Sequence, residues 1–221
     1  MSTKYIPVTI NKRLHLVPQN FLIIQACEQA FYNIPRFCYH EKLKTAGNCR
    51  MCVVEVLGGA KPVISCTNNV NKNMIIFTLS PMIKKAREST LEFLLINHPL
   101  DCPICDQGGE CDLQDETLNY GSDRSRYFFS YKRSIEDKDL GPIIKTIMTR
   151  CIHCTRCVRF CLEVLDNGSF GVFSRGETSG VGTYVKFFSK SELSGNLVDL
   201  CPVGQINVDH LRDLQIKDLG L

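Results

Sequence analysis

The spacing of the cysteines constrains this chain more than any other feature of its sequence. Of its 13 cysteines, 11 fall into three successive groups, and one histidine joins the second group. The first group is Cys38, Cys49, Cys52 and Cys66, the second is His98, Cys102, Cys105 and Cys111, and the third is Cys151, Cys154, Cys157 and Cys201. Four sulfur or nitrogen donors at such spacings are typical of metal centres, so we expect a fold organised around three of them.

The composition favours metal ligands over disulfide bonds. The chain has 221 residues, of which 44% are hydrophobic, enough for several small packed units. CxxC pairs in a sequence without a signal peptide indicate thiolate ligands in a reducing compartment. No apolar run approaches the roughly 18 residues that span a bilayer, so we expect membrane association only through partners.

The charge of the chain depends on its metal ligands. The formal value of +3 counts the cysteines as neutral thiols, and metal ligation removes their protons. Because ligation reverses the sign of the charge, no nucleic acid partner is expected. Five arginines close to ligand positions are expected to offset the negative charge, with an ordinary exposed surface position as the alternative for each. They are Arg36, Arg50, Arg150, Arg156 and Arg159.

Residues 1–80 are expected to form a small sheet crossed by one helix. Apolar and polar residues alternate over 4–10 and 13–17 around the turn sequence Asn11-Lys12, which predicts a β-hairpin. An amphipathic helix is predicted over 21–32. Further strands, with the first ligand group in the loops between them, are predicted at 52–57, 62–65 and 74–78.

Residues 81–121 are expected to be mainly helical. Ser80 and Pro81 are a suitable N-cap and first residue for a helix that ends before Pro99. A second helix is predicted over 112–120, where a glycine follows. The core-facing residues of the first helix are expected to be Ile83, Ala86, Thr90, Leu91, Leu94 and Leu95.

The C-terminal half of the chain is expected to contain a linker and a third unit. Residues 122–140 are charged and poor in apolar side chains, which predicts a linker or a surface strap. Gly141-Pro142 opens the third unit, 141–221. A helix is predicted after its clustered cysteines, followed by a glycine-rich section over 168–182 and a strand over 184–188.

The first ligand group has gaps of ten, two and thirteen residues between its cysteines. A plant-type two-iron ferredoxin has C-x4-C-x2-C and a distant fourth cysteine, so the longer first gap departs from that pattern. Gly47 lies in this loop, where the absence of a side chain lets backbone N–H groups approach the cluster sulfurs. We expect a 2Fe-2S cluster here, with a four-cysteine zinc site as the alternative.

The second and third groups indicate 4Fe-4S clusters. The spacing His-x3-Cys-x2-Cys-x5-Cys provides one neutral imidazole and three thiolates, and a zinc site with the same ligands is the alternative. In the third group, Cys-x2-Cys-x2-Cys supplies three corners and Cys201, followed by Pro202, the fourth. Cys161 does not complete the run C-x2-C-x2-C-x3-C-P because residue 162 is Leu. Cys161 and Cys27 are expected to be small buried hydrophobic residues.

No catalytic residues are expected in this chain. It contains no G-x-G-x-x-G, no P-loop and no Ser-His-Asp arrangement with local support. Its chemistry is therefore expected to come from its cofactors, one 2Fe-2S cluster and two 4Fe-4S clusters.

The ligand-containing stretches together resemble the large iron-sulfur subunit of respiratory complex I, NADH:ubiquinone oxidoreductase. They are CYHE from residue 38, GNCRMC from 47, HPLDCPICDQGGECDLQ from 98, TRCIHCTRCVRF from 149, and SELSGN from 191 with CPVG from 201. The resemblance covers nearly the whole chain and implies an α+β protein of three domains joined by a linker. These are a β-grasp two-iron ferredoxin domain at 1–80, a small helical four-iron domain with one His and three Cys ligands at 81–121, the linker at 122–140, and a ferredoxin-like four-iron domain at 141–221.

The resemblance also implies a role and a location. Members of this family pass electrons from a flavin-carrying subunit towards ubiquinone in the peripheral arm of a proton-translocating enzyme. The chain is therefore expected to be an electron-relay subunit without a substrate site of its own. Scarce alanine, abundant Ile, Asn and Lys, and the lack of a presequence favour a mitochondrial gene and the matrix side of the inner membrane, with a bacterial cytoplasm as the alternative.

The end of the chain departs from the family pattern. The family normally continues into a large domain resembling molybdopterin oxidoreductases, whereas this chain stops at Leu221. We expect a separate polypeptide to replace that domain and to cover the apolar side of a C-terminal helix. Its apolar residues are Val208, Leu211, Leu214 and Ile216.

Two rival functions follow from the same ligand groups. The diaphorase iron-sulfur subunit of an NAD-linked hydrogenase has similar cluster groups, but is expected to lack the SELSGN sequence. The other rival is a zinc-stabilised assembly protein without redox function, which would be colourless.

Overall fold

The structure is a computed structural model that describes residues 4–127, 131–140, 143–166, 168, 170–183 and 192–208. The chain divides into two units, each of which combines segments that are distant in sequence. Unit 1 is Met1–Tyr39, Thr45–Phe93 and Glu116–Ser125, and unit 2 is His40–Lys44, Leu94–Asp115 and Arg126–Leu221.

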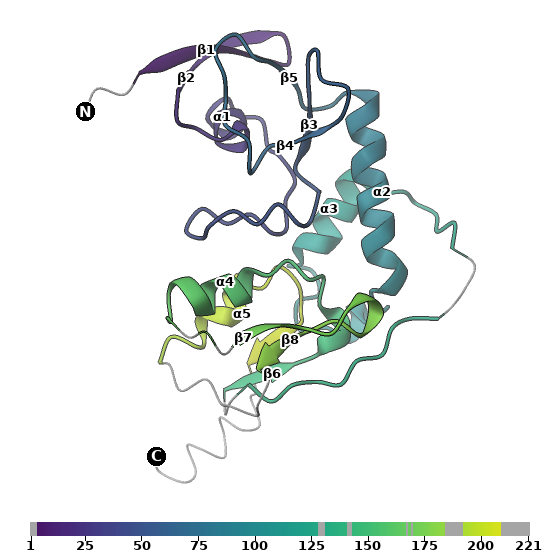
Figure 1. Cartoon of the computed structure of the whole chain (residues 1–221). Coiled ribbons are helices and arrows are strands. Elements are labelled where there is room, and N and C mark those ends of the chain that lie inside the picture. The colour runs from purple at the N-terminus through teal and green to yellow at the C-terminus, as the bar shows by residue number, and fades with distance from the viewer. Residues whose placement is uncertain are drawn as a thin grey trace. The chain divides into compact units, whose positions relative to one another are not determined.

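Unit 1 contains a mixed five-stranded sheet in the order β2-β1-β5-β3-β4 (Figure 1). β1 and β2 form the predicted hairpin, and Asn11 and Lys12 adopt positive φ angles of 47° and 70°, as a tight hairpin turn requires. β1 pairs in parallel with β5, whereas β3 pairs antiparallel with both β4 and β5. The strands are β1 (Tyr5–Ile10), β2 (Arg13–Pro18), β3 (Val53–Val56), β4 (Val63–Ile64) and β5 (Ile75–Phe77).

Helix α1 (Ile23–Gln29) packs its apolar side on this sheet and is shorter than the predicted helix at 21–32. It begins where the Gln25 side chain accepts a hydrogen bond from the Leu22 N–H at 2.9 Å. It ends before Phe31, whose φ of 62° is left-handed and cannot continue a helix. The parallel central strands and one packed helix are the topology expected of a β-grasp domain.

Helix α2 (Pro81–Asn97) begins as predicted, because the Ser80 Oγ accepts a hydrogen bond from the Ile83 N–H at 3.4 Å. Ile83 and Leu91 are fully buried, whereas the other predicted core residues of the helix are half-buried. The third fully buried residue of this face is Arg87, which was not predicted to lie in the core. Helix α3 (Asp112–Tyr120) has the predicted bounds.

Unit 2 contains two small antiparallel sheets and short helices around a second apolar core. β6 pairs with β9 and β7 with β8, so the glycine-rich section forms a hairpin that was not predicted. Helix α4 (Arg156–Glu163) confirms the predicted helix but begins earlier than expected, so that it contains Cys157, the last of the clustered cysteines. The other elements are η1 (Cys102–Ile104), β6 (Ile144–Thr146), η2 (Met148–Arg150), β7 (Phe170–Phe173), η3 (Gly176–Thr178), β8 (Gly180–Thr183), α5 (Asn196–Leu200) and β9 (Ile206–Val208).

Two expectations from the sequence fall outside the described residues. These are the strand at 184–188 and the C-terminal helix with Leu211, Leu214 and Ile216. Val208, which was expected to begin the apolar side of that helix, is instead the last residue of strand β9, because it pairs with Ile144. Within the part of the chain that is described, no helix is both long enough and apolar enough to cross a membrane.

Candidate metal centres

The four cysteines of the first ligand group meet in unit 1. Their thiols share hydrogen bonds, with Cys38 bonded to Cys49 and Cys66, and Cys52 bonded to Cys66. These bonds lower the pKa of Cys38 to about 2 and that of Cys52 to about 6, and raise the pKa values of Cys49 and Cys66. The four thiols are therefore close enough to share protons through hydrogen bonds, and this arrangement suits ligands that bind the corners of one cluster.

Backbone amides also point at these sulfurs. The N–H groups of Asn48 and Cys49 donate hydrogen bonds to Cys38 Sγ, in the loop that contains Gly47. Gly47 has a φ of 66°, and a Cβ at this position would lie 2.9 Å from Thr67 Cγ2. Only glycine adopts this conformation without strain and fits the space, so this residue lets the loop deliver its N–H groups to Cys38.

The second ligand group lies in unit 2. His98 follows α2, where burial and the nearby Arg133 guanidinium lower its pKa to about 4, so its imidazole is neutral at physiological pH and able to bind a metal. Burial raises the pKa of Cys111, and the nearby Cys105 thiol contributes in the same direction. Cys102 is exposed. Cys105 and Cys111 are thus near enough to interact electrostatically, and the neutral His98 imidazole is available for ligation.

The third ligand group surrounds one cavity in unit 2. Cys151, Cys154, Cys157 and Cys201 all line it, together with Val181, Val203 and Gln205. Burial raises the pKa of Cys151 to about 11 and that of Cys154 to about 12. These thiols are neutral without a metal and must release protons to bind one.

Backbone N–H groups surround the sulfurs of the third group. The amides of Val203, Gln205 and Ile206 donate hydrogen bonds to Cys201 Sγ, and the His153 N–H lies 3.4 Å from Cys151 Sγ. Such amide donors stabilise the negative sulfurs of an iron-sulfur cluster. The residues of this cavity therefore fit a four-iron cluster. Considering only the described residues, no three His, Cys, Asp or Glu side chains converge closely enough for a single metal ion.

The segment after Cys201 contacts both four-ligand groups of unit 2. Val203 and Gln205 line the cavity of the third ligand group, while the Pro202 carbonyl oxygen lies 3.9 Å from Cys111 Sγ. A Cβ built on Gly204 would collide with Cys105 Sγ, so the backbone of this residue lies directly against the second group. One short loop thus separates the two groups.

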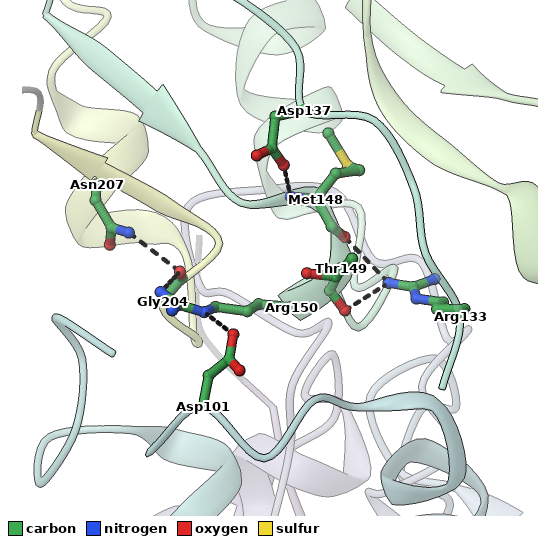
Figure 2. Close-up of polar contacts among 8 residues, drawn as sticks. All are labelled: Asp101, Arg133, Asp137, Met148, Thr149, Arg150, Gly204 and Asn207. Atoms are coloured by element: carbon green, nitrogen blue, oxygen red, sulfur yellow. Dashed lines mark hydrogen bonds and ion pairs between the residues drawn. The ribbon is translucent and has the colours of Figure 1, made fainter. Parts of the chain in front are cut away.

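Two arginines bind the backbone around the third group (Figure 2). Arg150 Nε donates to Asp101 Oδ2 at 3.1 Å, and its Nη1 donates to the Gly204 carbonyl at 3.3 Å. Arg133 Nη2 donates to the carbonyls of Met148 at 3.2 Å and Thr149 at 3.4 Å, and also to the Cys151 carbonyl. The Arg133 guanidinium thus holds the turn that precedes Cys151, and the Arg150 guanidinium joins that turn to Asp101 and Gly204.

Arg133 and Asp137 lie in the segment that was predicted to be a charged linker, and their structural role was not predicted. Asp137 Oδ1 accepts a hydrogen bond from the Met148 N–H at 2.6 Å, and Lys132 Nζ donates to the last carbonyls of α2, those of Leu95 and Ile96. Residues 131–140 therefore bind main-chain groups next to both ligand groups of unit 2. Their charge pattern alone gives no signal for such contacts.

The five arginines near ligand positions have different environments. Arg150 and Arg159 are buried, and Arg159 Nη1 donates to the Lys44 carbonyl at 2.6 Å. Arg156 lines the cavity of the third ligand group, and Arg36 is paired with Glu28. Arg50 is exposed, so the surface alternative describes it correctly.

The two cysteines outside the ligand groups are buried in apolar cores. Cys27 belongs to the core of unit 1 and Cys161 to that of unit 2. Burial raises the pKa of Cys27 to about 12 and that of Cys161 to about 11. Both therefore remain neutral thiols, as expected of small hydrophobic residues.

Three family models match successive parts of the chain. Residues 3–81 match a 2Fe-2S iron-sulfur cluster binding domain, and residues 87–126 match the NADH-ubiquinone oxidoreductase-G iron-sulfur binding region. Residues 141–207 match the ferredoxin-like domain of NADH-quinone oxidoreductase subunit 3. Together with the converging cysteines, these matches define an iron-sulfur protein that has both 2Fe-2S and 4Fe-4S binding domains.

Similar proteins identify the family more narrowly. The chain is 61% identical over 190 residues to the NADH-ubiquinone oxidoreductase 75 kDa subunit of Reclinomonas americana, and 57% identical over 190 residues to NADH dehydrogenase (ubiquinone) iron-sulfur protein 1, mitochondrial, of Solanum tuberosum. It is 56% identical over 191 residues to the corresponding NADH-quinone oxidoreductase protein of Rickettsia felis. The chain belongs with the N-terminal iron-sulfur part of this family, the large iron-sulfur subunit of respiratory complex I. Each alignment covers 86% of this chain, but only 27%, 26% and 28% of the respective relatives.

A solved structure shows the same fold. The chain superimposes on a chain of an NAD+-reducing NiFe-hydrogenase in the H2-reduced state with a TM-score of 0.83, covering 93% of this chain and 88% of that one. The two sequences are 22% identical, so this likeness shows the fold alone.

Proposed function

We propose that this chain is an electron-relay subunit of NADH:ubiquinone oxidoreductase, which accepts electrons from a flavin-carrying subunit and passes them towards ubiquinone. The observation that carries this proposal is the 53–61% identity to subunits of this enzyme, together with the matches to iron-sulfur family models, whose matched residues contain all three ligand groups. The chain spans less than a third of the length of these relatives. The proposal therefore concerns the iron-sulfur part of the enzyme. In this proposal the chain relays electrons and binds neither NADH nor ubiquinone.

The proposed cofactors are one 2Fe-2S cluster and two 4Fe-4S clusters, which supply reversible one-electron transfer when bound. The 2Fe-2S ligands are Cys38, Cys49, Cys52 and Cys66, the ligands of one 4Fe-4S cluster are His98, Cys102, Cys105 and Cys111, and those of the other are Cys151, Cys154, Cys157 and Cys201. The support is strongest for the first and third sets, because their sulfurs meet in the structure and accept backbone N–H hydrogen bonds.

The residues around the proposed ligands have two tasks. Val181 and Val203 keep water away from the third set, which limits side reactions and strengthens local electrostatic interactions. The N–H groups around Cys201 stabilise negative charge on its sulfur and so favour the reduced state.

We place the chain in the peripheral arm of the enzyme, on the matrix side of the mitochondrial inner membrane, or on the cytoplasmic face of a bacterial membrane. Relatives from mitochondria and from bacteria support both locations. Its contact with the membrane would be indirect, through the flavin-carrying subunit and other peripheral-arm subunits.

The second candidate is the diaphorase iron-sulfur subunit of an NAD-linked hydrogenase, which the common fold favours. The test is affinity purification of the tagged chain from its source under anaerobic conditions. We expect ubiquinone-reductase subunits to co-purify, and NADH to produce cluster EPR signals in the preparation. Recovery of hydrogenase subunits instead, or the absence of NADH-reducible signals, would contradict the proposal.

A further inference from the structure

We propose that Arg150 and Asp101 are a pair of positioning residues that hold the second ligand group against the third and set the reduction potentials of both centres. The inference rests on the proposed function, since it assumes that both groups bind 4Fe-4S clusters. It assigns a role to two residues that are not ligands themselves.

The two residues occupy equivalent places in their ligand loops. Asp101 immediately precedes Cys102, the first cysteine of the second group, and Arg150 immediately precedes Cys151, the first cysteine of the third. The 3.1 Å bond between Arg150 Nε and Asp101 Oδ2 therefore joins two loops that are 49 residues apart in sequence (Figure 2). The charges involved lie one residue away from a proposed ligand on each side.

The same guanidinium reaches a third segment. Its Nη1 donates to the Gly204 carbonyl at 3.3 Å, and this carbonyl also accepts a hydrogen bond from Asn207 Nδ2 at 3.1 Å. Gly204 lies three residues after Cys201, and its backbone touches Cys105. Arg150 thus binds at once to the loop of the second group and to the segment that separates the two groups.

The turn that carries Arg150 is fixed from its other side. Arg133 donates to the carbonyls of Met148 and Thr149, and the Asp137 carboxylate accepts the Met148 N–H (Figure 2). This turn, η2, ends at Arg150 itself. Because its backbone is held, the Arg150 side chain has little freedom to choose another partner, which lowers the entropy lost in forming the pair.

Burial makes the pair electrostatically effective. The Arg150 side chain is 5% exposed and that of Asp101 is 32% exposed, so solvent screens the cation less than the anion. A buried positive charge stabilises the additional electron that each cluster receives on reduction, and the carboxylate opposes it. Removing the cation should therefore make both four-iron centres harder to reduce, and removing the anion should make them easier to reduce.

Other charged groups around the pair keep their positions in this test. Arg133 lies near His98 and the Cys151 carbonyl, and Lys132 binds the end of α2. Both cations are unchanged in every variant compared, so their effect on the reduction potentials is the same in each. The opposite signs expected for the Arg150 and Asp101 variants do not depend on them.

The experiment compares Arg150→Gln, Arg150→Lys and Asp101→Asn in the intact anaerobically purified complex. Arg175→Gln is the matched control, because Arg175 is an exposed arginine of the same unit. Iron content is measured first, and reduction potentials are then measured by EPR-monitored potentiometry. We expect Asp101→Asn to shift the reduction equilibrium of both 4Fe-4S centres roughly tenfold towards the reduced state, or about 59 mV upward, and Arg150→Gln to shift it downward by a similar factor.

A structural role alone would not produce shifts of opposite sign. Arg150→Lys keeps the charge without the fork that binds two acceptors, so it should move the potentials less than Arg150→Gln. Unchanged potentials, or shifts of the same sign in Asp101→Asn and Arg150→Gln, would overturn the inference while the proposed function stood. If Arg150→Gln fails to assemble, the direction of the Asp101→Asn shift decides alone. A wild-type complex without iron would instead refute the proposed function.

Discussion

The backbone of Gly204 lies against the sulfur of Cys105, although the two residues are 99 positions apart in sequence. Gly204 follows the last ligand of the third group, and Cys105 belongs to the second. A side chain at position 204 would occupy the volume of the Cys105 thiol and would also come within 3.2 Å of Gln107 Cβ. The separation of the two groups in unit 2 therefore depends on a glycine.

Gly204→Ala is expected to damage the second centre. The new methyl group must displace Cys105 Sγ or the loop after Cys201, and either movement changes the position of a proposed ligand sulfur relative to that loop. We expect the loss of one 4Fe-4S EPR signal and of about four irons per chain, measured in the anaerobic complex.

Gly195→Ala is the matched control for this prediction. No atom lies within 4 Å of a Cβ built on Gly195, and its φ of −58° suits any residue. This variant should keep the wild-type iron content. Equal iron content in Gly204→Ala would show that the packing of Gly204 on Cys105 does not matter for cluster binding.

Arg87→Met is expected to destabilise unit 1. Arg87 is 1% exposed, its Nη2 donates to the Val53 carbonyl at 2.9 Å, and its guanidinium lies 5.2 Å from the centre of the Tyr120 ring. Methionine fills the space but leaves a buried carbonyl unpaired and removes the cation-π contact. These losses amount to about 2–4 kcal/mol, or a fall in melting temperature of roughly 4–16 °C.

Lys85→Met provides the comparison, because the Lys85 side chain is 69% exposed on the same helix. Thermal denaturation followed by circular dichroism should show little change for this variant. A melting temperature of Arg87→Met within one or two degrees of the wild type, under the same conditions, would mean that the buried guanidinium contributes no net stability.

Cys161→Ala and Cys201→Ala are expected to differ sharply. Cys201 lines the cavity of the third ligand group and accepts three backbone N–H hydrogen bonds, whereas Cys161 lies in the core one helical turn after Cys157. EPR spectroscopy should therefore show the third-group signal in Cys161→Ala and lose it in Cys201→Ala. The opposite result would identify Cys161 as the fourth ligand.

Cys27 should make stability depend on pH in the alkaline range. Its folded pKa of about 12 lies above the ordinary value of 9.0, so its contribution is complete below pH 9 and is lost as the pH rises towards 12. The stability difference between wild type and Cys27→Ala should therefore fall by about 1.4 kcal/mol per pH unit in this window. Urea denaturation at pH 8 and pH 10 measures it, and a constant difference would show that the thiol ionises freely in the folded state.

Local signals in the sequence predicted much of unit 1 and both longer helices. The Asn11-Lys12 turn, the Ser80 cap and the glycine after α3 each determine a boundary through neighbouring residues alone. The predicted ends of α1 were less accurate, because no glycine in the sequence marks the left-handed conformation that Phe31 adopts. The hairpin of β7 and β8 was missed because its glycines interrupt the alternation that marks a strand.

The charged residues were the main source of error at the candidate site. Arg87 lies between Ile83 and Leu91 on the buried face of α2, where the helical spacing fits a core residue but the charge of arginine suggests a solvent-facing one. Arg133 and Asp137 lie in a segment whose composition resembles a linker, yet both bind main-chain groups near Cys151. Such contacts form between segments that are distant in sequence, so the local pattern around each charged residue does not predict them.

The central claim is that the three ligand groups bind iron-sulfur clusters. The most direct test is the iron, acid-labile sulfide and zinc content of the anaerobically purified chain with its native partners, normalised to this chain by subtracting the iron of other subunits. We predict about ten irons and about ten sulfides per chain, with little zinc. The 2Fe-2S cluster would supply about two of each, and each of the two 4Fe-4S clusters about four of each. Stoichiometric zinc with little iron would contradict the account.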